Sequence, residues 1–283
     1  MLLLKTSKDL HKWLDAQRKK NATIGFVPTM GALHEGHISL IDASNMAMNV
    51  TVCSIYVNPT QFNDPKDFEK YPVTIEQDIL KLEKAGCDIL FLPSSREIYP
   101  DGLKSEIFYD LGYLETILEG KYRPGHFQGV CAVVDKLLEI VNPDYLYLGQ
   151  KDYQQCMVID RLLELKGKKK EIDVVICPTL RESDGLAMSS RNVRLNKTER
   201  EKATAIYHCL NYIKKNYKKD NISEVTEKAT VILIDAGFKV DYIELADAKD
   251  LSPINKWDGK QKLVALAAAY MNEVRLIDNI LLN

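Results

Sequence analysis

The chain has 283 residues, more than one compact core usually needs, so we expect one large domain or two modest ones. Its hydrophobic fraction of 46% and charged fraction of 28% are ordinary for a soluble globular protein, and a net charge of −2 argues against a general nucleic-acid or membrane-surface binder. No stretch approaches the ~20 apolar residues of a membrane span, and the apolar run at the N-terminus is too short for a signal peptide.

Apolar runs rich in Val, Ile, Tyr and Phe alternate with amphipathic runs over the first 180 residues. Because charge is largely confined to their ends, the apolar runs predict strands buried on both faces. These strands are Thr23–Val27, Val50–Val57, Asp88–Leu92, Asp144–Leu148 and Ile172–Cys177. The amphipathic runs predict helices at Gly36–Met48, Ile75–Ala85, Gln128–Val141 and Asp152–Lys166. This alternation predicts an α/β fold, a parallel sheet with covering helices whose ligands lie at the carboxyl ends of the strands.

The pattern changes after about residue 180, where helices are followed by strands. Asn196–Asn216 reads as one long helix, capped by Asn196 with Glu199 three residues on, and Ser223–Ala236 as a second helix. Strand-like segments follow at Asp241–Leu245, Lys262–Ala268 and Arg275–Leu281. We therefore predict two domains, residues 1–179 and a smaller α+β domain over residues 180–283.

Six cysteines are widely spaced, and none forms a Cys-x-x-Cys pair, so the spacing typical of a metal site is absent. Cys53 and Cys177 lie in apolar runs and are expected to be buried. Free, buried cysteines favour a reducing cytoplasmic setting.

The segment Pro28–His37 (PTMGALHEGH) directly follows the first predicted strand and opens a helix. A strand, a turn of small residues and a helix N-terminus together favour an anion, because free backbone N–H groups and the helix dipole attract phosphate. His34 and His37 stand three residues apart, so one turn of helix presents both to the same ligand. A metal pair or two structural histidines are the alternatives.

The segment Gly149–Gln155 (GQKDYQQ) follows another predicted strand and begins a helix. The ammonium group of Lys151 can there neutralise a phosphoryl group, and Gln155, four residues on, has an amide suited to hydroxyl and carboxylate groups. A surface lysine at a charged helix start is the alternative.

The segment Ala187–Asn192 (AMSSRN) places the hydroxyls of Ser189 and Ser190 beside the guanidinium of Arg191, which could together clamp a triphosphate. A polar hinge loop is the alternative. Two further segments, Tyr56–Phe62 and Lys121–Phe127, carry Asn58 and Gln61, and Arg123 and His126, although either could be only a turn.

Taken in order, the blocks PTMGALHEGH, VNPTQF, YRPGHF, LGQKDYQQ, AMSSRN and RLIDN resemble the pantothenate synthetase (pantoate–β-alanine ligase) family over nearly the whole chain. HEGH resembles the HxGH signature of the nucleotidyltransferase superfamily. The resemblance implies a Rossmann-like first domain that binds ATP and pantoate, a smaller C-terminal lid domain, and a homodimer. It implies that pantoate is activated by ATP as pantoyl adenylate with release of pyrophosphate, and that β-alanine then displaces AMP to give pantothenate, a coenzyme A precursor.

The resemblance also implies roles for individual residues. His34, His37 and Lys151 would be catalytic, holding the ATP phosphates and neutralising the α-phosphate. Asp152 and Gly149 would meet the ribose, while Ser189, Ser190 and Arg191 would hold the outer phosphates. Gln61 and Gln155 would bind pantoate, Met30 would line the cleft, and Asn58 would orient the nucleotide or the β-alanine amine.

Mg²⁺ would accompany ATP, and Asp78 is the family-matching candidate for its shell, with an exposed helix carboxylate as the alternative. The sequence departs from the family pattern at Val73, where a basic residue is common, and at Asn272, where glycine is usual. Since Asn adopts a left-handed backbone more readily than most residues, we expect the turn at Asn272 to survive.

Two other classes compete with this interpretation. A tRNA synthetase of the same superfamily would need an RNA-binding extension and a basic face, and neither is visible in the sequence. A nucleotide-binding protein without turnover should have lost site residues, yet His34, His37 and Lys151 are all present.

Overall fold

The computed structural model describes residues 1–103, 107–218 and 221–283. Over these ranges the chain forms two compact units. The first consists of Met1–Gly149 and Gln155–Pro178, and the second of Gln150–Gln154 and Thr179–Asn283. Residues 150–154 therefore group with the second unit, although they lie in the middle of the chain that builds the first.

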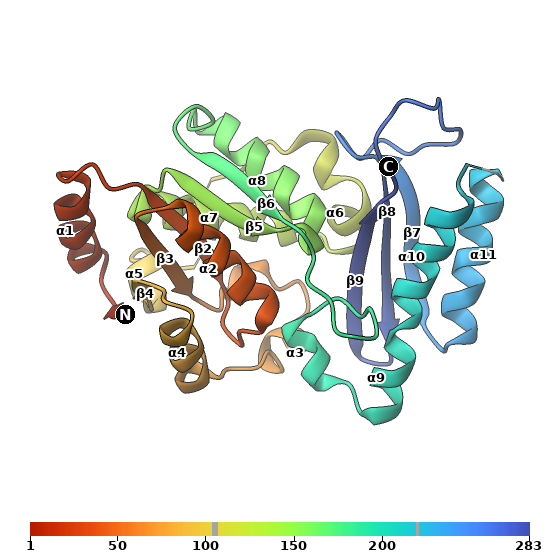
Figure 1. Ribbon diagram of the computed structural model, residues 1–283, viewed down its shortest axis with the longest axis horizontal. Coiled ribbons are helices and arrows are strands. Elements are labelled where there is room, and N and C mark those ends of the chain that lie inside the picture. Colours follow the sequence, from red (N-terminus) through yellow and green to blue (C-terminus); the bar gives the residue numbers. More distant parts are fainter. Residues whose placement is uncertain (104–106, 219–220) are drawn as a thin grey trace. The chain divides into compact units, whose positions relative to one another are not determined.

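The first unit is built around a six-stranded sheet in the order β1-β4-β3-β2-β5-β6, in which every neighbouring pair is parallel (Figure 1). Its strands are β1 (Leu2–Leu4), β2 (Ile24–Thr29), β3 (Val50–Ile55), β4 (Ile89–Phe91), β5 (Tyr145–Gly149) and β6 (Asp173–Cys177). All strands predicted in this region are confirmed to within two residues at each end, and β1 is an addition. The predicted α/β fold is thus correct.

Helices lie between these strands. They are α1 (Ser7–Arg18), α2 (Glu35–Ala47), α3 (Pro65–Glu69), α4 (Ile75–Lys84), α5 (Ser95–Ile98), α6 (Leu118–Tyr122), α7 (His126–Val141) and α8 (Tyr153–Leu165), with short 3₁₀ turns η1 (Pro59–Gln61), η2 (Gly112–Glu115) and η3 (Gln150–Asp152). The predicted helices correspond to α2, α4, α7 and α8. None of the helices in the described ranges is both long and apolar enough to cross a membrane.

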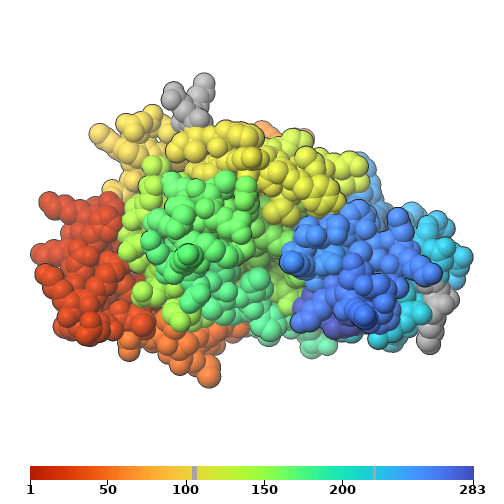
Figure 2. Space-filling view, turned by 90° about the horizontal axis from the view of Figure 1, so that it is seen from above, coloured from red at the N-terminus to blue at the C-terminus, as the bar shows by residue number. Residues whose placement is uncertain are grey.

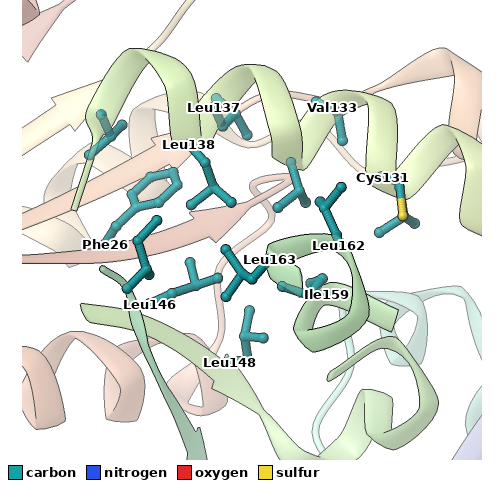
Figure 3. Packing of buried hydrophobic residues seen from close by; sticks show 14 of the residues in the cluster. Phe26, Cys131, Val133, Leu137, Leu138, Leu146, Leu148, Ile159, Leu162 and Leu163 are labelled. Carbon is teal, nitrogen blue, oxygen red and sulfur yellow. The ribbon is translucent and has the colours of Figure 1, made fainter. Parts of the chain in front are cut away.

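Alternate residues of the strands enter two separate cores, one on each face of the sheet, as side chains that alternate along a strand require. Phe26 of β2 and Leu146 and Leu148 of β5 pack against α7 and α8, as Figure 3 shows. Val27 and Tyr147, their neighbours in sequence, join the second core with residues of α2 and α4. The strands are continuous apolar runs in the sequence because both faces of the sheet are covered.

Helix α8 and the segment around residues 110–120 share one face of the first unit, where Figure 2 draws them in green and yellow. A polar cluster around the buried carboxylate of Asp135 holds this segment. The hydroxyl of Tyr109 donates to Asp135 Oδ2 (2.9 Å), and the Lys166 ammonium donates to the same oxygen (2.9 Å). Burial, followed by the hydrogen bond to Asp135, raises the pKa of Tyr109.

The second unit contains an antiparallel sheet, β7-β8-β9, packed against helices. Its elements are η4 (Ser190–Arg194), α9 (Lys197–Ala203), α10 (Ala205–Asn216), α11 (Ile222–Asp235), β7 (Lys239–Asp247), β8 (Leu263–Met271) and β9 (Val274–Leu281). Hairpin β8–β9 turns at Asn272, whose φ of 50° confirms the expected left-handed backbone.

The prediction of one helix over residues 196–216 is wrong, because α9 and α10 are separate and meet at Thr204. The Thr204 hydroxyl donates to the carbonyl of Glu201 (3.0 Å) at this junction. The predicted cap is confirmed, since Asn196 Oδ1 accepts the Glu199 N–H and the Glu199 carboxylate accepts the Asn196 N–H.

Candidate functional site

Strand order defines where a ligand would bind in the first unit. The chain runs outward from β2 to β3 and β4 on one side, and from β5 to β6 on the other. Strands β2 and β5 are therefore the two sides of the point at which the winding reverses, and crevices form there beyond the carboxyl ends of such strands. The segments Met30–His34 and Gly149–Asp152 leave these two strands.

The loop after β2 is held by a buried carboxylate. Asp78 of α4 is 0% exposed, and its two oxygens accept the backbone N–H groups of Ala32 and Leu33 (2.8 Å each). Ala32 has a φ of 49°, a left-handed conformation that costs an alanine about 1–2 kcal/mol. The carboxylate thus stabilises a strained loop immediately before α2, and Asp78 is not the exposed helix carboxylate considered as an alternative.

Two histidines begin α2 in a reciprocal cap. His34 Nδ1 accepts the N–H of Gly36 (3.1 Å), and His37 Nδ1 accepts the N–H of His34 (3.2 Å). Because each Nδ1 accepts a hydrogen bond, the hydrogen of each neutral ring is on Nε2. The rings lie side by side, with centroids 4.0 Å apart. The cap therefore fixes the tautomer that presents two N–H donors at a positive helix end, an arrangement suited to phosphate oxygens.

Gln61 and Met30 are in direct contact. Gln61 Nε2 donates to Met30 Sδ (2.9 Å), which brings the turn after β3 to the loop after β2. Asn58 lies beneath this contact and is 0% exposed. Its Nδ2 donates to Gln61 Oε1 and the Gly129 carbonyl, while its Oδ1 accepts the hydroxyls of Thr60 and Tyr99. The amide of Asn58 is thus fully used within the protein and orients Gln61.

Helix α7 supports Gln61 from its other side. His126 Nδ1 lies 2.8 Å from the Gln61 carbonyl oxygen and therefore donates to it, while His126 Nε2 lies 3.0 Å from Nη1 of Arg123. Arg123 also donates from Nε to Asn63 Oδ1 (3.2 Å) and forms an ion pair with Glu119. The segment Lys121–Phe127 is consequently more than a turn, because it holds the backbone that carries Gln61.

Lys151 and Asp152 belong to the second unit, in the turn η3 that directly follows β5. Lys151 Nζ lies 3.7 Å from Asp152 Oδ1. Asn279 of β9 holds the turn, since its Nδ2 donates to the carbonyls of Gln150 (2.9 Å) and Lys151 (2.8 Å). These hydrogen bonds hold the backbone of Lys151 and thereby set the point from which its side chain extends.

Ser189, Ser190 and Arg191 follow a short hairpin of the second unit, in which Arg181 pairs with Ala187. Ser189 caps η4, with its Oγ accepting the N–H of Arg191 (3.3 Å), and Ser190 is 9% exposed. Asn192 Nδ2 donates to the Ala187 carbonyl (3.1 Å) and closes the loop. Residues 190–192 of the segment thus lie in the 3₁₀ helix η4, and its phosphate role stays a prediction.

Gly149 and Gln155 belong to the first unit. Gly149 ends β5 and pairs with Cys177 of β6, and Gln155 lies half-buried in the first turn of α8. The predicted residues thus form two groups. The first unit contains Met30, His34, His37, Asn58, Gln61, Asp78, Gly149 and Gln155. The second unit contains Lys151, Asp152, Ser189, Ser190 and Arg191.

Among the described residues, the side chains do not form a recognisable protein metal site. Within the described ranges, no group of three or more His, Cys, Asp or Glu side chains is placed to hold an ion. Both oxygens of Asp78, the candidate for a magnesium shell, are engaged by backbone N–H groups in a buried position. These contacts favour a positioning role, and the magnesium role of Asp78 stays a prediction.

A parallel α/β sheet with a histidine-capped helix at its switch point defines the class, a doubly wound α/β protein whose α2 N-terminus is suited to an anion. The sequence profile described as pantoate-beta-alanine ligase matches residues 2–281. The chain therefore belongs to the pantoate-beta-alanine ligase family and is a ligase, which confirms the resemblance noted from its sequence.

Similar proteins agree over their full lengths. A pantothenate synthetase of Cytophaga hutchinsonii is 43% identical over 100% of this chain and 99% of its own. A crystal structure of pantothenate synthetase from Thermus thermophilus superposes with a TM-score of 0.90 at 36% identity, covering 99% of both chains. The pantoate-beta-alanine ligase from Francisella tularensis, solved in complex with beta-gamma ATP and beta-alanine, has a TM-score of 0.81 at 41% identity, covering 99% of this chain and 97% of its own.

Proposed function

We propose that this protein condenses pantoate with β-alanine at the expense of ATP, through a pantoyl-adenylate intermediate. The observation that carries the proposal is family membership over residues 2–281. A pantoate carboxylate oxygen attacks the α-phosphorus of ATP, and pyrophosphate leaves. The β-alanine amine then attacks the acyl carbon, losing a proton as AMP leaves, and pantothenate results.

The geometry supports the first half of this reaction. Transfer of an adenylyl group needs positioned reactants and neutralised charge rather than a protein nucleophile. The Nε2–H groups of His34 and His37 are assigned to phosphate oxygens at the helix N-terminus. Lys151 is assigned to the α-phosphate, where its charge counts most in the transition state.

Further contacts complete the site. Ser189, Ser190 and Arg191 are assigned to the outer phosphates, and Asp152 with the backbone of Gly149 to the ribose. For pantoate, Gln61 and Gln155 are assigned to its polar groups, with Met30 beside them. We assign Asn58 an indirect role, because its amide is spent on orienting Gln61.

Mg²⁺ is proposed to enter with the ATP phosphates. Magnesium is commonly bound by substrate phosphates and water with few protein ligands, which agrees with the lack of a side-chain cluster in the described ranges. We also propose a homodimer in a reducing cytoplasm. The cysteines support the reducing setting, since all six are buried with free thiols.

Residues 1–179 are proposed to act as the ATP- and pantoate-binding domain and residues 180–283 as a lid that supplies the AMSSRN loop. A tRNA synthetase would conflict with family membership. A nucleotide-binding protein without turnover is distinguished by the assay below.

The test is pyrophosphate release from purified protein with Mg-ATP and pantoate. A single-turnover burst is expected without β-alanine, changing to steady formation of AMP and pantothenate when β-alanine is added. Absence of pyrophosphate under both conditions would reject the ligase proposal for pantoate, and other carboxylic acids would then be screened.

A further inference from the structure

The second unit contains a connected polar cluster to which sequence reasoning assigned no role. It is centred on two neighbouring residues of β9, Asp278 and Asn279, which are both 2% exposed. The cluster contacts η3, which carries Lys151, and the hairpin that leads into residues 187–192.

Asn279 makes the contacts on the η3 side. Its Nδ2 donates both hydrogens, to the carbonyl oxygens of Gln150 and Lys151, and its Oδ1 accepts from Gln150 Nε2 (3.2 Å). Because the Asn279 amide binds two successive backbone carbonyls, it fixes the orientation of the peptide between Gln150 and Lys151. The starting point of the Lys151 side chain is therefore set by a residue 128 positions further along the chain.

Asp278 makes the contacts on the hairpin side. Its carboxylate forms a bidentate pair with Arg181, at 2.6 and 2.9 Å. Arg181 Nη1 also donates to the Gly185 carbonyl (3.1 Å), and Nη2 to the Asn279 carbonyl (3.1 Å). Arg181 thereby closes the loop of residues 181–187 and fastens it to β9.

The hairpin is shaped for this arrangement. The Arg181 guanidinium lies over the Tyr207 ring, 4.5 Å from its centroid. Gly185 has a φ of 93°, and a Cβ added to it would lie 2.1 Å from a ring carbon of Tyr207, so only glycine fits between the loop and the ring. Loop, ring and guanidinium therefore form one packed layer.

The electrostatics link the two sides. Burial raises the pKa of Asp278, and the Arg181 guanidinium, with a smaller contribution from Lys151, opposes that rise. Burying a carboxylate of this kind costs free energy unless its hydrogen-bond partners are held in a fixed geometry. The Lys151 charge therefore acts on the pKa of Asp278 in the same direction as Arg181, but more weakly.

We propose that Asp278 and Asn279 are positioning residues. Asn279 anchors the Lys151 turn to β9. Asp278, through Arg181, anchors the hairpin that leads into residues 187–192. The inference rests on the proposed function for its kinetic consequences, but the anchoring itself does not depend on it. Catalysis by positioning tolerates little displacement, since a shift of about 1 Å can lower a rate by about a hundredfold.

The first variant is Asn279→Ala, with Arg275→Ala as the matched control. Arg275 lies on the same strand, and its Nε donates to Asp241 Oδ2 of β7 (2.8 Å), so the control removes a polar contact of the sheet away from the turn. Asn279→Ala is expected to lower the single-turnover rate of pyrophosphate release about tenfold to a hundredfold, with less than about a threefold change in KM for ATP. Arg275→Ala is expected to remain within about threefold of the wild type.

A double-mutant cycle separates positioning from loss of stability. If Asn279 acts through Lys151, Asn279→Ala should have little further effect in a Lys151→Ala background. An equal fold-loss in both backgrounds would overturn the proposal. If Asn279→Ala does not fold, Asn279→Ser applies the same test, because its hydroxyl has one donor hydrogen in place of two.

The hairpin side is tested with Arg181→Lys, which keeps the charge but loses the planar fork. This variant should raise KM for ATP several-fold and change the single-turnover rate less, because the 187–192 loop is assigned to the outer phosphates. A rate loss with unchanged KM would contradict that assignment.

Amide hydrogen exchange of the full-length protein supplies a readout that does not need activity. Asn279→Ala should accelerate exchange in residues 150–154 and leave β8 protected, whereas Arg275→Ala should not accelerate it in the turn. Unchanged exchange in the turn would overturn the anchoring. Should the wild type release no pyrophosphate, the proposed function fails, and the exchange measurement still decides whether Asn279 holds the turn.

Discussion

Gly129 of α7 and Thr60 of η1 approach so closely that a Cβ on Gly129 would lie 2.2 Å from the carbonyl oxygen of Thr60. Their backbones are in direct van der Waals contact, and the Gly129 carbonyl also accepts from Asn58. The position of Gln61 in η1 therefore depends on Gly129 of α7 having no side chain.

We expect Gly129→Ala to displace η1, so that Gln61 loses its position. KM for pantoate should then rise about tenfold, and KM for ATP should rise less. Lys136→Ala, on the same helix but with a solvent-accessible side chain, is the control. Steady-state kinetics with each substrate varied in turn provide the measurement, and a change confined to KM for ATP would contradict the assignment of Gln61 to pantoate.

His34 serves both as a helix cap and as the proposed phosphate donor, and two substitutions separate these roles. His34→Ala should destabilise the protein by about 1 kcal/mol and weaken both ATP binding and pyrophosphate release. His34→Asn should recover most of the stability, since Asn is a favourable cap, but not the activity. Thermal unfolding and the pyrophosphate assay check the two effects, and recovered activity in His34→Asn would refute the phosphate contact.

Lys151→Ala should slow formation of the adenylate about a hundredfold or more while changing ATP affinity less, because its charge matters most as the α-phosphate is transferred. Rapid-quench measurement of the pyrophosphate burst tests this. A burst of normal rate would exclude Lys151 from the first step.

Asp78→Asn tests loop positioning against magnesium binding. The amide can accept one backbone N–H but turns its own hydrogens toward the other, so we expect a loss of stability of about 1–3 kcal/mol and a higher KM for ATP at every Mg²⁺ concentration. Activity titrated with Mg²⁺ at several ATP concentrations decides between the two. A higher Mg²⁺ requirement at unchanged stability would instead support the magnesium role.

The buried phenol of Tyr109 predicts a loss of stability in alkali. Its pKa is raised by burial, so its stabilising contribution is complete below the ordinary tyrosine pKa of about 10 and is lost as the pH rises above that value. Tyr109→Phe should therefore lose less stability than the wild type between about pH 9 and pH 11, with a difference in slope of up to about 1.4 kcal/mol per pH unit. Urea unfolding across this range measures it, and parallel curves would show that Tyr109 is not the group responsible.

The strands of the first sheet could be predicted because they are buried on both faces, which makes them continuous apolar runs bounded by polar residues. Strand β1 was missed because Leu2–Leu4 is too short to show a pattern. The division between α9 and α10 was missed because only one residue, Thr204, separates the two helices, and threonine is not a helix breaker.

Residues proposed to contact a ligand were easier to find in the sequence than residues that hold those side chains in position. Histidines and a lysine after strands are visible in sequence, whereas Asn58 was expected to touch a substrate and is instead wholly engaged within the protein. Asn279 contacts Lys151 across 128 positions of the chain, and no local pattern encodes such a contact. Gly129 inside α7 is a local sign of a close approach, because helix interiors disfavour glycine.

The grouping of Gln150–Gln154 with Thr179–Asn283 has a consequence for how this chain can be divided or recombined. The peptide crosses between the units at residues 149–150, 154–155 and 178–179, so a cut near residue 178 leaves the Lys151 segment in one fragment and its anchor on β9 in the other. A second unit exchanged between relatives must therefore include a pentapeptide that the sequence places between two segments of the first. The two halves are expected to change together in evolution rather than behave as interchangeable modules.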